Sequence, residues 1–560
     1  MTTQLSPHVD TDELRANLRQ ADPGVLVAVL AQLTGDPSVV DRFAPRITYV
    51  PDPPEHAGVT DDDVTADALV DAVTAALSAP RPAAAPAADN RALFARIAPV
   101  ALGTPVPDDY IDLLLEQGGF QPSQPVLPRT AKLPETFKVT IIGAGIAGLA
   151  AARTLADRGH DAVLLEARDR IGGRIWTSRW SDAAIDLGAS WIHGVDGNPI
   201  AELARAVGVR TVATTYENSS DYGTDGRPLD RAATAALKRW QHVVATAVSD
   251  AQDEAEDDDP DTSLRSVAER AVNWAALPPP DRALVASVLN EYEQEYAGSA
   301  TELSSRYFDD DNELEGGDVL FPAGYGAITD HLAKGLTIRT GRVVDRIDWT
   351  GSGVTVSAGT DTYTGEHVVV TLPLGVLQSG AVQFGRDLPA DTTTAIAKLG
   401  MGLLDKCFLR FPSRFWPDTD WLTYVPPAEN AGQWAQWVNY ARAAGQPILL
   451  GFNAADFGRT VETWSDGAII DSAMGTLRTI FGADIPAPVD YRITRWSADP
   501  YARGSYSFNK VGSTPEMRDH LAATVDGRVH FAGEATDRNS FATVHGAYNS
   551  GLRAADEISG

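Results

Sequence analysis

The amino-acid sequence predicts an α/β fold of two or three domains, with a helical domain at the N-terminus. At 560 residues the chain is too long for one hydrophobic core. From Lys138 onward, strand-like segments alternate with helix-like segments, a pattern typical of sheets that are covered by helices. The apolar fraction of 44% and the charged fraction of 22% are those of an ordinary globular protein.

Residues 1–130 are expected to form the helical N-terminal domain. The segment "ADPGVLVAVLAQLTG" offers Asp22 as a helix cap, Pro23 in the first turn and Gly35 as the end of the helix. The proline-rich segment "QPSQPVLPRTAKLPETF" then indicates an extended linker. No catalytic cluster stands out before this linker, so we expect the domain to serve docking or homo-oligomerisation.

Charge and composition exclude several classes of protein. A net charge of −30 argues against a nucleic-acid-binding protein, which needs a basic surface to neutralise phosphates. Cys407 is the one cysteine, so neither an intrachain disulfide nor a cysteine-based metal site is expected, and no metal is predicted. The sequence shows no secretory signal and no run of about 18 apolar residues that would span a membrane. We therefore expect a soluble cytoplasmic protein.

The segment "KVTIIGAGIAGLAAARTLADRGHDAVLLEA" predicts a strand, a glycine-rich turn, a helix and a second strand. Gly143 would make the tight turn, Gly145 would let the backbone approach a pyrophosphate, and Gly148 would let helix and strand pack closely. Glu166 follows Gly148 by 18 residues, where a carboxylate can accept both hydroxyls of a ribose. This context predicts a Rossmann-like dinucleotide-binding unit.

Three further motifs identify a resemblance. They are "ARDRIGGRIWT" at 167–177, "DLGASWIHG" at 186–194 and "VHFAGEATDRNSFATVHGAYNSGLRAADEI" at 529–558. With the glycine-rich turn, they resemble the FAD-dependent flavin amine oxidases. The likeness is closest to polyamine oxidases and extends to monoamine oxidases and lysine-specific histone demethylases. It runs from about residue 138 to the C-terminus.

The resemblance implies two interleaved domains. The FAD-binding domain would comprise residues 138–210, 322–385 and 525–560. A substrate-binding domain, built from a mixed sheet and helices, would comprise residues 211–321 and 386–524.

The resemblance also implies which residues hold FAD. Arg174 and the glycines before it would meet the pyrophosphate, and Glu534 would face the ribityl and pyrophosphate part. "GRVVDRI" at 341–347 resembles the strand whose Val343 contacts the adenine end. Ser505 stands where monoamine oxidases carry the cysteine that tethers FAD, so non-covalent FAD is expected. The full set is Gly143, Gly145, Gly148, Glu166, Arg168, Gly173, Arg174, Ser190, Trp191, Val343, Glu534, Thr543 and Val544.

A lysine stands inside the strand-like segment "GLLDKCFLRF" at 402–411. Alternation puts Lys406 on one face of this strand and Asp405 on the other. One interpretation is a half-exposed strand whose cations are in water. The other follows from the resemblance, in which a lysine before an aromatic pair, here Phe415 and Trp416, holds a water against flavin N5. We favour the second interpretation and expect Lys406 to be catalytic.

Four more residues match catalytic positions of the resembled family. Trp496 and Tyr506 would lie near the flavin as part of an aromatic cage, although ordinary core packing is the alternative. Thr543 stands where many amine oxidases have the second cage tyrosine, which would widen the pocket. His193 matches a pocket-mouth histidine of back-converting polyamine oxidases, and a purely structural role for it stays open.

The resemblance implies oxidation of an amine by hydride transfer to flavin N5. The resulting imine would be hydrolysed to an aldehyde and an amine, and O2 would be reduced to H2O2. The expected partners are O2 and a small-molecule amine, a polyamine or related secondary amine. An L-amino-acid oxidase or monooxygenase is an alternative that needs a carboxylate-binding arginine, such as Arg306 or Arg410. A demethylase-like or scaffold protein and a desaturase relative are less favoured.

Overall fold

A computed structural model of the chain describes residues 134–560, apart from 181–182 and 256–258. By its internal contacts the chain divides into two compact units, Met1–Ala131 and Lys132–Gly560, and the described residues belong to the second. The helices predicted for residues 1–130, and their role in oligomerisation, lie outside the described residues.

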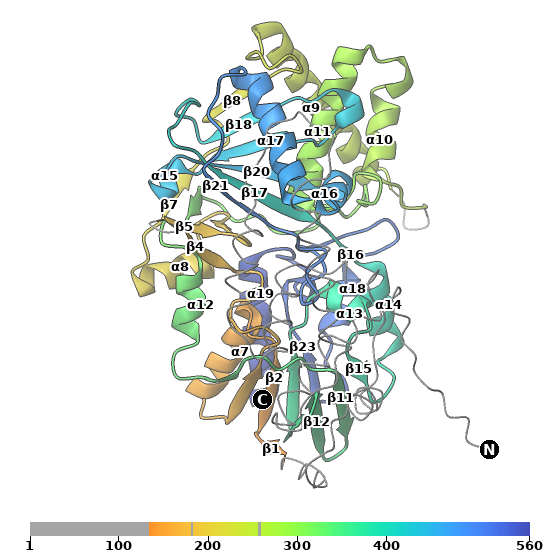
Figure 1. Cartoon of the computed structure of the whole chain (residues 1–560). Coiled ribbons are helices and arrows are strands. Elements are labelled where there is room, and N and C mark those ends of the chain that lie inside the picture. The colour runs from red at the N-terminus through yellow and green to blue at the C-terminus, as the bar shows by residue number, and fades with distance from the viewer. Residues whose placement is uncertain (1–133, 181–182, 256–258) are drawn as a thin grey trace, which may run out of the picture. The chain divides into compact units, whose positions relative to one another are not determined.

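A five-stranded parallel sheet lies in the lower half of Figure 1. Apart from the edge strand β10, its strands are largely apolar and buried, because both faces of the sheet are covered. The helices α7 (Ile146–Asp157), α19 (Val544–Ser559) and α12 (Gly326–Leu332) pack on one face. The spatial order of the strands is β10 (Thr337–Arg339), β3 (Ala162–Leu165), β2 (Val139–Ile142), β14 (His367–Val370) and β23 (Val529–Phe531).

A second five-stranded sheet covers the other face of the parallel sheet. Apolar side chains of both sheets, among them Ile347, Val356 and Phe531, form one buried cluster. Its strands in spatial order are β1 (Glu135–Thr136), β13 (Asp361–Gly365), β12 (Gly353–Ala358), β11 (Arg346–Thr350) and β15 (Gln383–Phe384).

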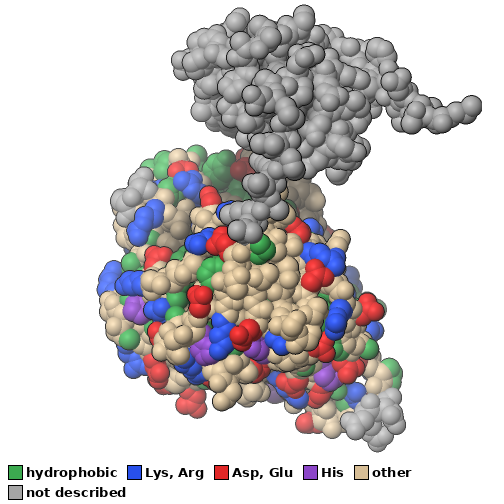
Figure 2. Space-filling view, turned by 90° about the horizontal axis from the view of Figure 1, so that it is seen from below, with side chains coloured by type: hydrophobic (Ala, Val, Ile, Leu, Met, Phe, Trp, Pro, Cys, Tyr) green, Lys and Arg blue, Asp and Glu red, His purple; other side chains and the backbone are tan. Residues whose placement is uncertain are grey.

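The surface at this end of the molecule carries both signs of charge. Figure 2 views it from below and shows Lys and Arg side chains interspersed with Asp and Glu side chains. Arg346 and Asp348, for example, form an exposed ion pair of 2.6 Å. Opposite charges therefore alternate over this face.

A six-stranded mixed sheet forms the centre of the upper half in Figure 1. All of its strand pairs are antiparallel except the last. The order is β21 (Asp490–Ile493), β17 (Leu404–Arg410), β20 (Ile448–Ala454), β19 (Gln436–Asn439), β18 (Trp421–Tyr424) and β8 (Ser219–Tyr222). The larger helices of this half are α9 (Arg231–Asp253), α10 (Leu264–Ala271), α11 (Pro279–Tyr296), α16 (Ala455–Glu462) and α17 (Asp466–Phe481).

Shorter elements complete the described fold. The strands are β4 (Thr177–Trp180), β5 (Ala183–Asp186), β6 (Trp191–Ile192), β7 (Val212–Thr214), β9 (Asp318–Leu320), β16 (Gly400–Met401) and β22 (Ser507–Phe508). The helices are α8 (Pro199–Val207), α13 (Leu374–Gln378), α14 (Ala390–Lys398), α15 (Ala441–Ala444) and α18 (Glu516–Ala522), with short 3-10 turns at Trp274–Ala276, Ala428–Asn430 and Glu534–Thr536.

The observed architecture agrees with the predicted fold class. Strands of the parallel sheet come from stretches of chain that are separated by the strands of the six-stranded sheet, so the two halves are interleaved. None of the described helices combines the length and apolar character that crossing a membrane requires.

Candidate functional site

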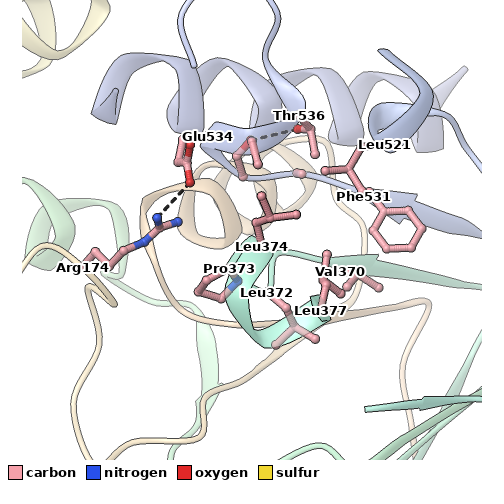
Figure 3. Close-up of a pocket in the computed structure, with 13 residues that line it drawn as sticks. Arg174, Val370, Leu372, Pro373, Leu374, Leu377, Leu521, Phe531, Glu534 and Thr536 are labelled. Atoms are coloured by element: carbon pink, nitrogen blue, oxygen red, sulfur yellow. Dashed lines mark hydrogen bonds and ion pairs between the residues drawn. The ribbon is translucent and has the colours of Figure 1, made fainter. Parts of the chain in front are cut away.

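A partly buried ion pair lies at the carboxyl ends of β14 and β23, the edge where parallel sheets bind ligands. Figure 3 shows Arg174 and Glu534 joined beside a pocket whose lining includes Val370 and Phe531 from these strands. Arg174 Nη1 donates to Glu534 Oε1 at 2.8 Å and to the carbonyl oxygen of Ser505 at 2.9 Å. Both of these bonds use Nη1, so within the described structure Nε and Nη2 are left for a phosphate.

Glu534 is held in its charged form. Burial alone would raise the pKa of its carboxyl, but Arg174, Ser507 and Arg518 outweigh burial and lower that pKa. The hydroxyl of Ser507 donates to Oε2 at 2.6 Å, and the backbone N–H of Ala542 donates to the same oxygen at 3.0 Å. The sequence predicts a functional carboxylate here, and the geometry is that of a fixed, buried one.

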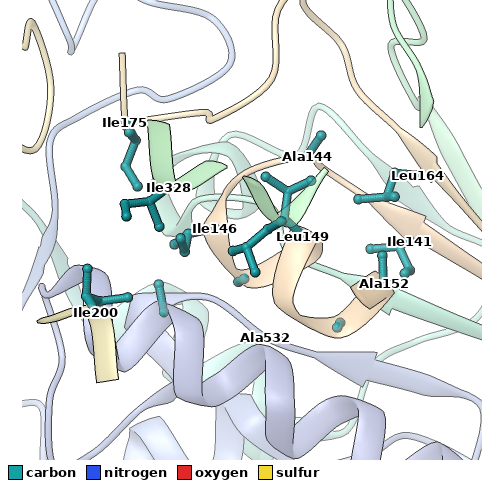
Figure 4. Close-up of a cluster of buried hydrophobic side chains, with 14 of the residues drawn as sticks. Ile141, Ala144, Ile146, Leu149, Ala152, Leu164, Ile175, Ile200, Ile328 and Ala532 are labelled. Carbon is teal, nitrogen blue, oxygen red and sulfur yellow. The ribbon is translucent and has the colours of Figure 1, made fainter. Parts of the chain in front are cut away.

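The predicted glycine-rich turn connects β2 to α7. Figure 4 shows Ile146 and Leu149 of α7 in the same apolar cluster as Ile141, which fixes the start of the helix against the sheet. Gly143 has a φ of +100°, a conformation that side chains rarely allow. A Cβ on Gly148 would lie 2.0 Å from the carbonyl oxygen of Gly143, so helix and turn pack as closely as the sequence predicts.

A second glycine loop lies against the first and leaves an open cradle. The backbone N–H of Gly172 donates to Ala144 O at 2.8 Å, and a Cβ on Gly173 would lie 3.4 Å from the Cα of Gly145. A Cβ on Gly145 itself would meet only Gly172 O, at 4.0 Å. The space above Gly145 is therefore free for a close approach of a pyrophosphate, and the residues fit a dinucleotide.

Glu166 directly follows β3 and is buried. Its carboxylate accepts from the backbone N–H groups of Ala144 at 2.8 Å and Arg168 at 2.9 Å. Nearby, Arg168 Nη2 pairs with Asp499 at 2.7 Å.

The strand predicted around Val343 is wrong. Residues 341–345 lie between β10 and β11 and belong to neither strand, and Val343 is 46% exposed. The backbone N–H groups of Gly341 and Arg342 donate to the carbonyl oxygens of Arg168 and Glu166, both at 2.8 Å. These bonds hold the segment beside Glu166.

Helix α19 begins at Val544, as predicted, and Thr543 is its cap. The Thr543 hydroxyl accepts from the backbone N–H of Gly546 at 2.9 Å and donates to Ser540 O at 2.7 Å. His545 in the first turn is buried, and no partner in the described structure reaches its Nε2. Burial, with a smaller contribution from His193, lowers the pKa of His545 to about 4.

Lys406 is 6% exposed, so the half-exposed strand interpretation is wrong. Strand β17 lies between β20 and β21, and its residues from Asp405 to Leu409 are all buried. Lys406 Nζ donates to Gly188 O at 2.5 Å, to Ser190 Oγ at 2.6 Å and to Asp186 O at 3.0 Å. Burial lowers the pKa of Lys406 to about 7, against the opposing charge of Asp186.

Aromatic side chains surround this lysine. The Trp191 ring centroid lies 5.7 Å from Lys406 Nζ. Trp496 is buried, donates through Nε1 to Leu187 O at 3.2 Å, and meets Trp176 edge to face. The segment 186–190 thus brings together Lys406, Ser190, Trp191 and Trp496, four residues that the sequence singles out.

Tyr506 and His193 are held from neighbouring elements. The Tyr506 hydroxyl donates to Gln294 O on α11 at 2.8 Å, and burial raises the pKa of Tyr506. His193 is accessible, with 59% of its side chain exposed, and its Nδ1 lies 3.0 Å from Asp318 Oδ2. Its ring also stacks on Trp191, so His193 has both a structural contact and an exposed face.

Two residues near His193 and Tyr506 were not expected from the sequence. Glu295, the penultimate residue of α11, is exposed, yet burial of its carboxyl raises its pKa to about 7, with further increases from Glu313 and Asp311. Tyr216 is 59% exposed and stacks on Trp421 with centroids 4.5 Å apart, and burial raises the pKa of its phenol. Both side chains are therefore exposed groups whose surroundings still favour the protonated form.

Electrostatic interactions connect these residues. The charge of Glu295 acts on Tyr506 and on Tyr216, and His193 acts on Glu295. These four residues, called the Glu295 cluster below, supply a carboxylate, two phenols and an imidazole. In the sequence, Glu291 and Glu295 stand one helical turn apart, and this spacing was the signal from which the Glu295 carboxylate could have been predicted.

Comparisons with known proteins identify the family of the chain. The model of the family described as flavin containing amine oxidoreductase matches residues 146–559. Polyamine oxidase 4 of Oryza sativa subsp. japonica is 33% identical over 445 residues, which are 77% of this chain and 90% of that protein. Lysine-specific histone demethylase 1 homolog 2 of Arabidopsis thaliana is 35% identical over 433 residues, which are 75% of this chain and 58% of that protein.

A solved structure of a redesigned double mutant of putrescine oxidase has the same fold. Its TM-score is 0.61 at 19% sequence identity, and the match covers 76% of this chain and 100% of that one. The family model, the curated relatives and the fold agree with one another. The chain belongs to the family of flavin-containing amine oxidoreductases.

Proposed function

We propose that this enzyme uses non-covalent FAD to oxidise a polyamine or a related secondary amine at a C–N bond. The products would be an aldehyde and an amine, formed by hydrolysis of the imine, together with H2O2 from O2. The observation that carries the choice of substrate is the Glu295 cluster, in which the Glu295 carboxylate acts on Tyr216 and Tyr506 and is acted on by His193. A substrate with a second cationic nitrogen would find both a counter-charge and aromatic faces there.

The chain's residues fit the flavin that the family implies. The two glycine loops and Arg174 would hold a pyrophosphate, and Glu166 would take a ribose. Bound FAD would supply hydride acceptance from the amine and two-electron reduction of O2. Ser505, at the position of the tethering cysteine, exchanges hydrogen bonds with the backbone of Leu404, and Cys407 is buried in β17 with a raised pKa. Both features support a non-covalent cofactor.

Lys406, Trp496 and Tyr506 would prepare the amine and the solvent around it. The lowered pKa of Lys406 means that its amine exchanges a proton near neutral pH and can orient a water for imine hydrolysis or for the oxygen step. Trp496, which is buried, and Tyr506, which is partly buried, would exclude bulk water and favour the uncharged form of the reacting nitrogen. Glu295 would bind a distal ammonium and so fix which C–N bond reaches the flavin.

Oxidation of amino acids has less support. It requires an arginine for the substrate carboxylate, and the two candidates are engaged elsewhere. Arg410 donates to Gln446 at 3.1 Å, and its guanidinium lies over the Trp180 ring, at the opposite end of β17 from Leu404. Arg306 donates to Asp259 O at 3.3 Å.

The test is anaerobic bleaching of the bound flavin by a panel of amines. The panel contains spermine, spermidine, their N-acetyl forms, putrescine, aromatic monoamines and L-amino acids. Rapid bleaching by a polyamine, with the cleavage products identified by mass spectrometry, is the expected result. Bleaching by amino acids alone, or by none of the panel, would overturn the proposal.

A further inference from the structure

Asp405 is buried on the face of β17 opposite to Lys406, with 2% of its surface exposed. Its Oδ1 accepts from the hydroxyl of Thr494 at 2.7 Å and from the backbone N–H of Trp496 at 3.1 Å. In the part of the chain that the structure describes, no donor reaches its Oδ2, although that oxygen is also buried. An ionised carboxylate would leave this oxygen uncompensated.

Glu462, the last residue of α16, faces Asp405 across the same turn. Its carboxylate accepts from the backbone N–H groups of Ser497 at 2.7 Å and Ala498 at 3.1 Å. The carboxyl groups of Asp405 and Glu462 thus accept from consecutive backbone N–H groups of one turn, and the charge of Glu462 acts on Asp405. A proton on Asp405 would give its buried Oδ2 a donor group and remove the repulsion between two neighbouring carboxylates.

We propose that Asp405 and Glu462 share one proton, and that this pair positions Trp496 and strand β17 at the flavin site. Together the two carboxyl groups accept hydrogen bonds from the backbone N–H groups of Trp496, Ser497 and Ala498. Thr494 completes the link to the catalytic strand. The Thr494 hydroxyl accepts from the backbone N–H of Lys406 at 2.8 Å, and the backbone N–H of Thr494 donates to the backbone carbonyl oxygen of Lys406 at 3.0 Å.

The charged groups around the pair do not supply another counter-charge. Lys406 follows Asp405 in the chain, but its Nζ is bonded to the segment 186–190 on the opposite face. Arg495, in the same turn, binds Asp466 at 2.6 Å. Burial, followed by Glu462, raises the pKa of Asp405 well above its usual range, in agreement with a proton on Asp405 at neutral pH.

Loss of this proton would put two negative charges beside each other, one of them on the buried Asp405. Repulsion between Asp405 and Glu462 would then loosen the turn that carries Trp496. We therefore expect the flavin environment to change with pH in a way that depends on Asp405. Asparagine at position 405 can donate its amide N–H to Glu462, so it keeps the contact and removes the proton.

The first test is infrared spectroscopy of the holoenzyme at neutral pH. The carbonyl band of a protonated carboxylic acid is expected in the wild type and is expected to be lost in Asp405→Asn. Asp456→Asn, which changes an exposed acid of the same helix, should keep the band. A band that persists in Asp405→Asn, or that is absent from the wild type, would overturn the shared proton.

The second test reads the flavin by visible circular dichroism during a titration to alkaline pH. The wild type should show a transition, Asp405→Asn should not, and Asp405→Ala should already differ at neutral pH. If the spectrum of Asp405→Asn is no closer to that of the wild type than the spectrum of Asp405→Ala is, the positioning role is wrong. Neither readout depends on which amine is oxidised, so a failure of the proposed function would leave both interpretable.

Discussion

The Nζ of Lys406 lies 2.6 Å from the hydroxyl oxygen of Ser190. The carbonyl oxygens of Asp186 and Gly188 complete a set of three acceptors around it. An ammonium has three N–H donors, so a charged Lys406 has every donor occupied by the protein. Lys406 can then bind a water in one of two ways. The water donates to the lone pair of the neutral amine, or it replaces one of these three acceptors of the ammonium.

Replacement of the lysine should separate cofactor binding from turnover. Lys406→Met is expected to retain FAD, because its side chain is not part of the glycine cradle. Reoxidation of the reduced flavin by O2 should slow by about 10²-fold, the lower end of what a positioned proton-transfer group contributes. Stopped-flow absorbance of the reduced protein mixed with O2 measures this rate. Unchanged reoxidation would show that the buried amine has only a structural role.

The titration of Lys406 predicts a dependence of stability on pH. Its pKa is about 7 in the folded protein and near 10.5 in the unfolded chain, so between these values only the unfolded chain binds the proton. The free energy of unfolding should therefore rise with pH across this window, by at most about 1.4 kcal/mol per pH unit. Burial raises the pKa of Asp186 to about 6, which keeps its titration below the window.

Lys406→Met removes this contribution and is its own control. The unfolding free energy of the wild type minus that of the variant should become more positive from pH 7 to pH 10. Denaturant titrations of both proteins at several pH values, at equal flavin content, measure the difference. Parallel pH dependences would mean that the folded lysine keeps its proton.

Two glycine substitutions should separate cofactor binding from folding. A Cβ at Gly145 meets no protein atom closer than 4.0 Å, so Gly145→Ala should fold with stability within about 1 kcal/mol of the wild type. The added methyl group would occupy the space of the pyrophosphate, and FAD affinity should fall by more than tenfold. In Gly148→Ala the Cβ would lie 2.0 Å from Gly143 O, so this variant should lose several kcal/mol of stability, as overpacked sites do.

The measurements are FAD binding by quenching of flavin fluorescence and thermal unfolding of the apoproteins. The contrast between the two alanines is the informative result. Equal loss of stability in both would assign Gly145 to packing rather than to the cofactor.

The fold was predictable because its signals are local. The glycine turn, the apolar strands on either side and the cap at Thr543 each lie within a few residues of the element that they define. Val343 shows where local reasoning fails. Two adjacent valines indicate a strand, but backbone bonds to Arg168 and Glu166, nearly 180 residues earlier in the chain, determine the path.

The site was predictable where residues lie in motifs and not where tertiary packing creates the chemistry. Lys406 and Trp496 stand in recognisable segments. Glu295 owes its raised pKa to burial and to acids from another loop, and Asp405 owes its role to a glutamate on α16. Neither environment can be predicted from the residues that neighbour Glu295 or Asp405 in the sequence.

Removal of the Glu295 carboxylate should discriminate between substrates by whether they carry a second positive charge. Glu295→Gln is expected to raise KM for spermidine about tenfold, equivalent to about 1.4 kcal/mol of lost interaction. A monoamine of similar length, which has no distal ammonium, should show little change in KM. Steady-state kinetics with both substrates measure the contrast, and Glu202→Gln, an exposed position on α8, is the matched control.

The pH dependence of the same two proteins makes the assignment specific. The Glu295 carboxylate forms as pH rises through about 7, so the wild-type KM for the polyamine should fall across this range. The fall should be absent in Glu295→Gln, while the pH dependence of kcat, governed by Lys406 and the reacting nitrogen, should persist. If the variant raises KM equally for the monoamine and the polyamine, Glu295 affects substrate binding without contacting the distal charge, and the polyamine must be recognised by other residues.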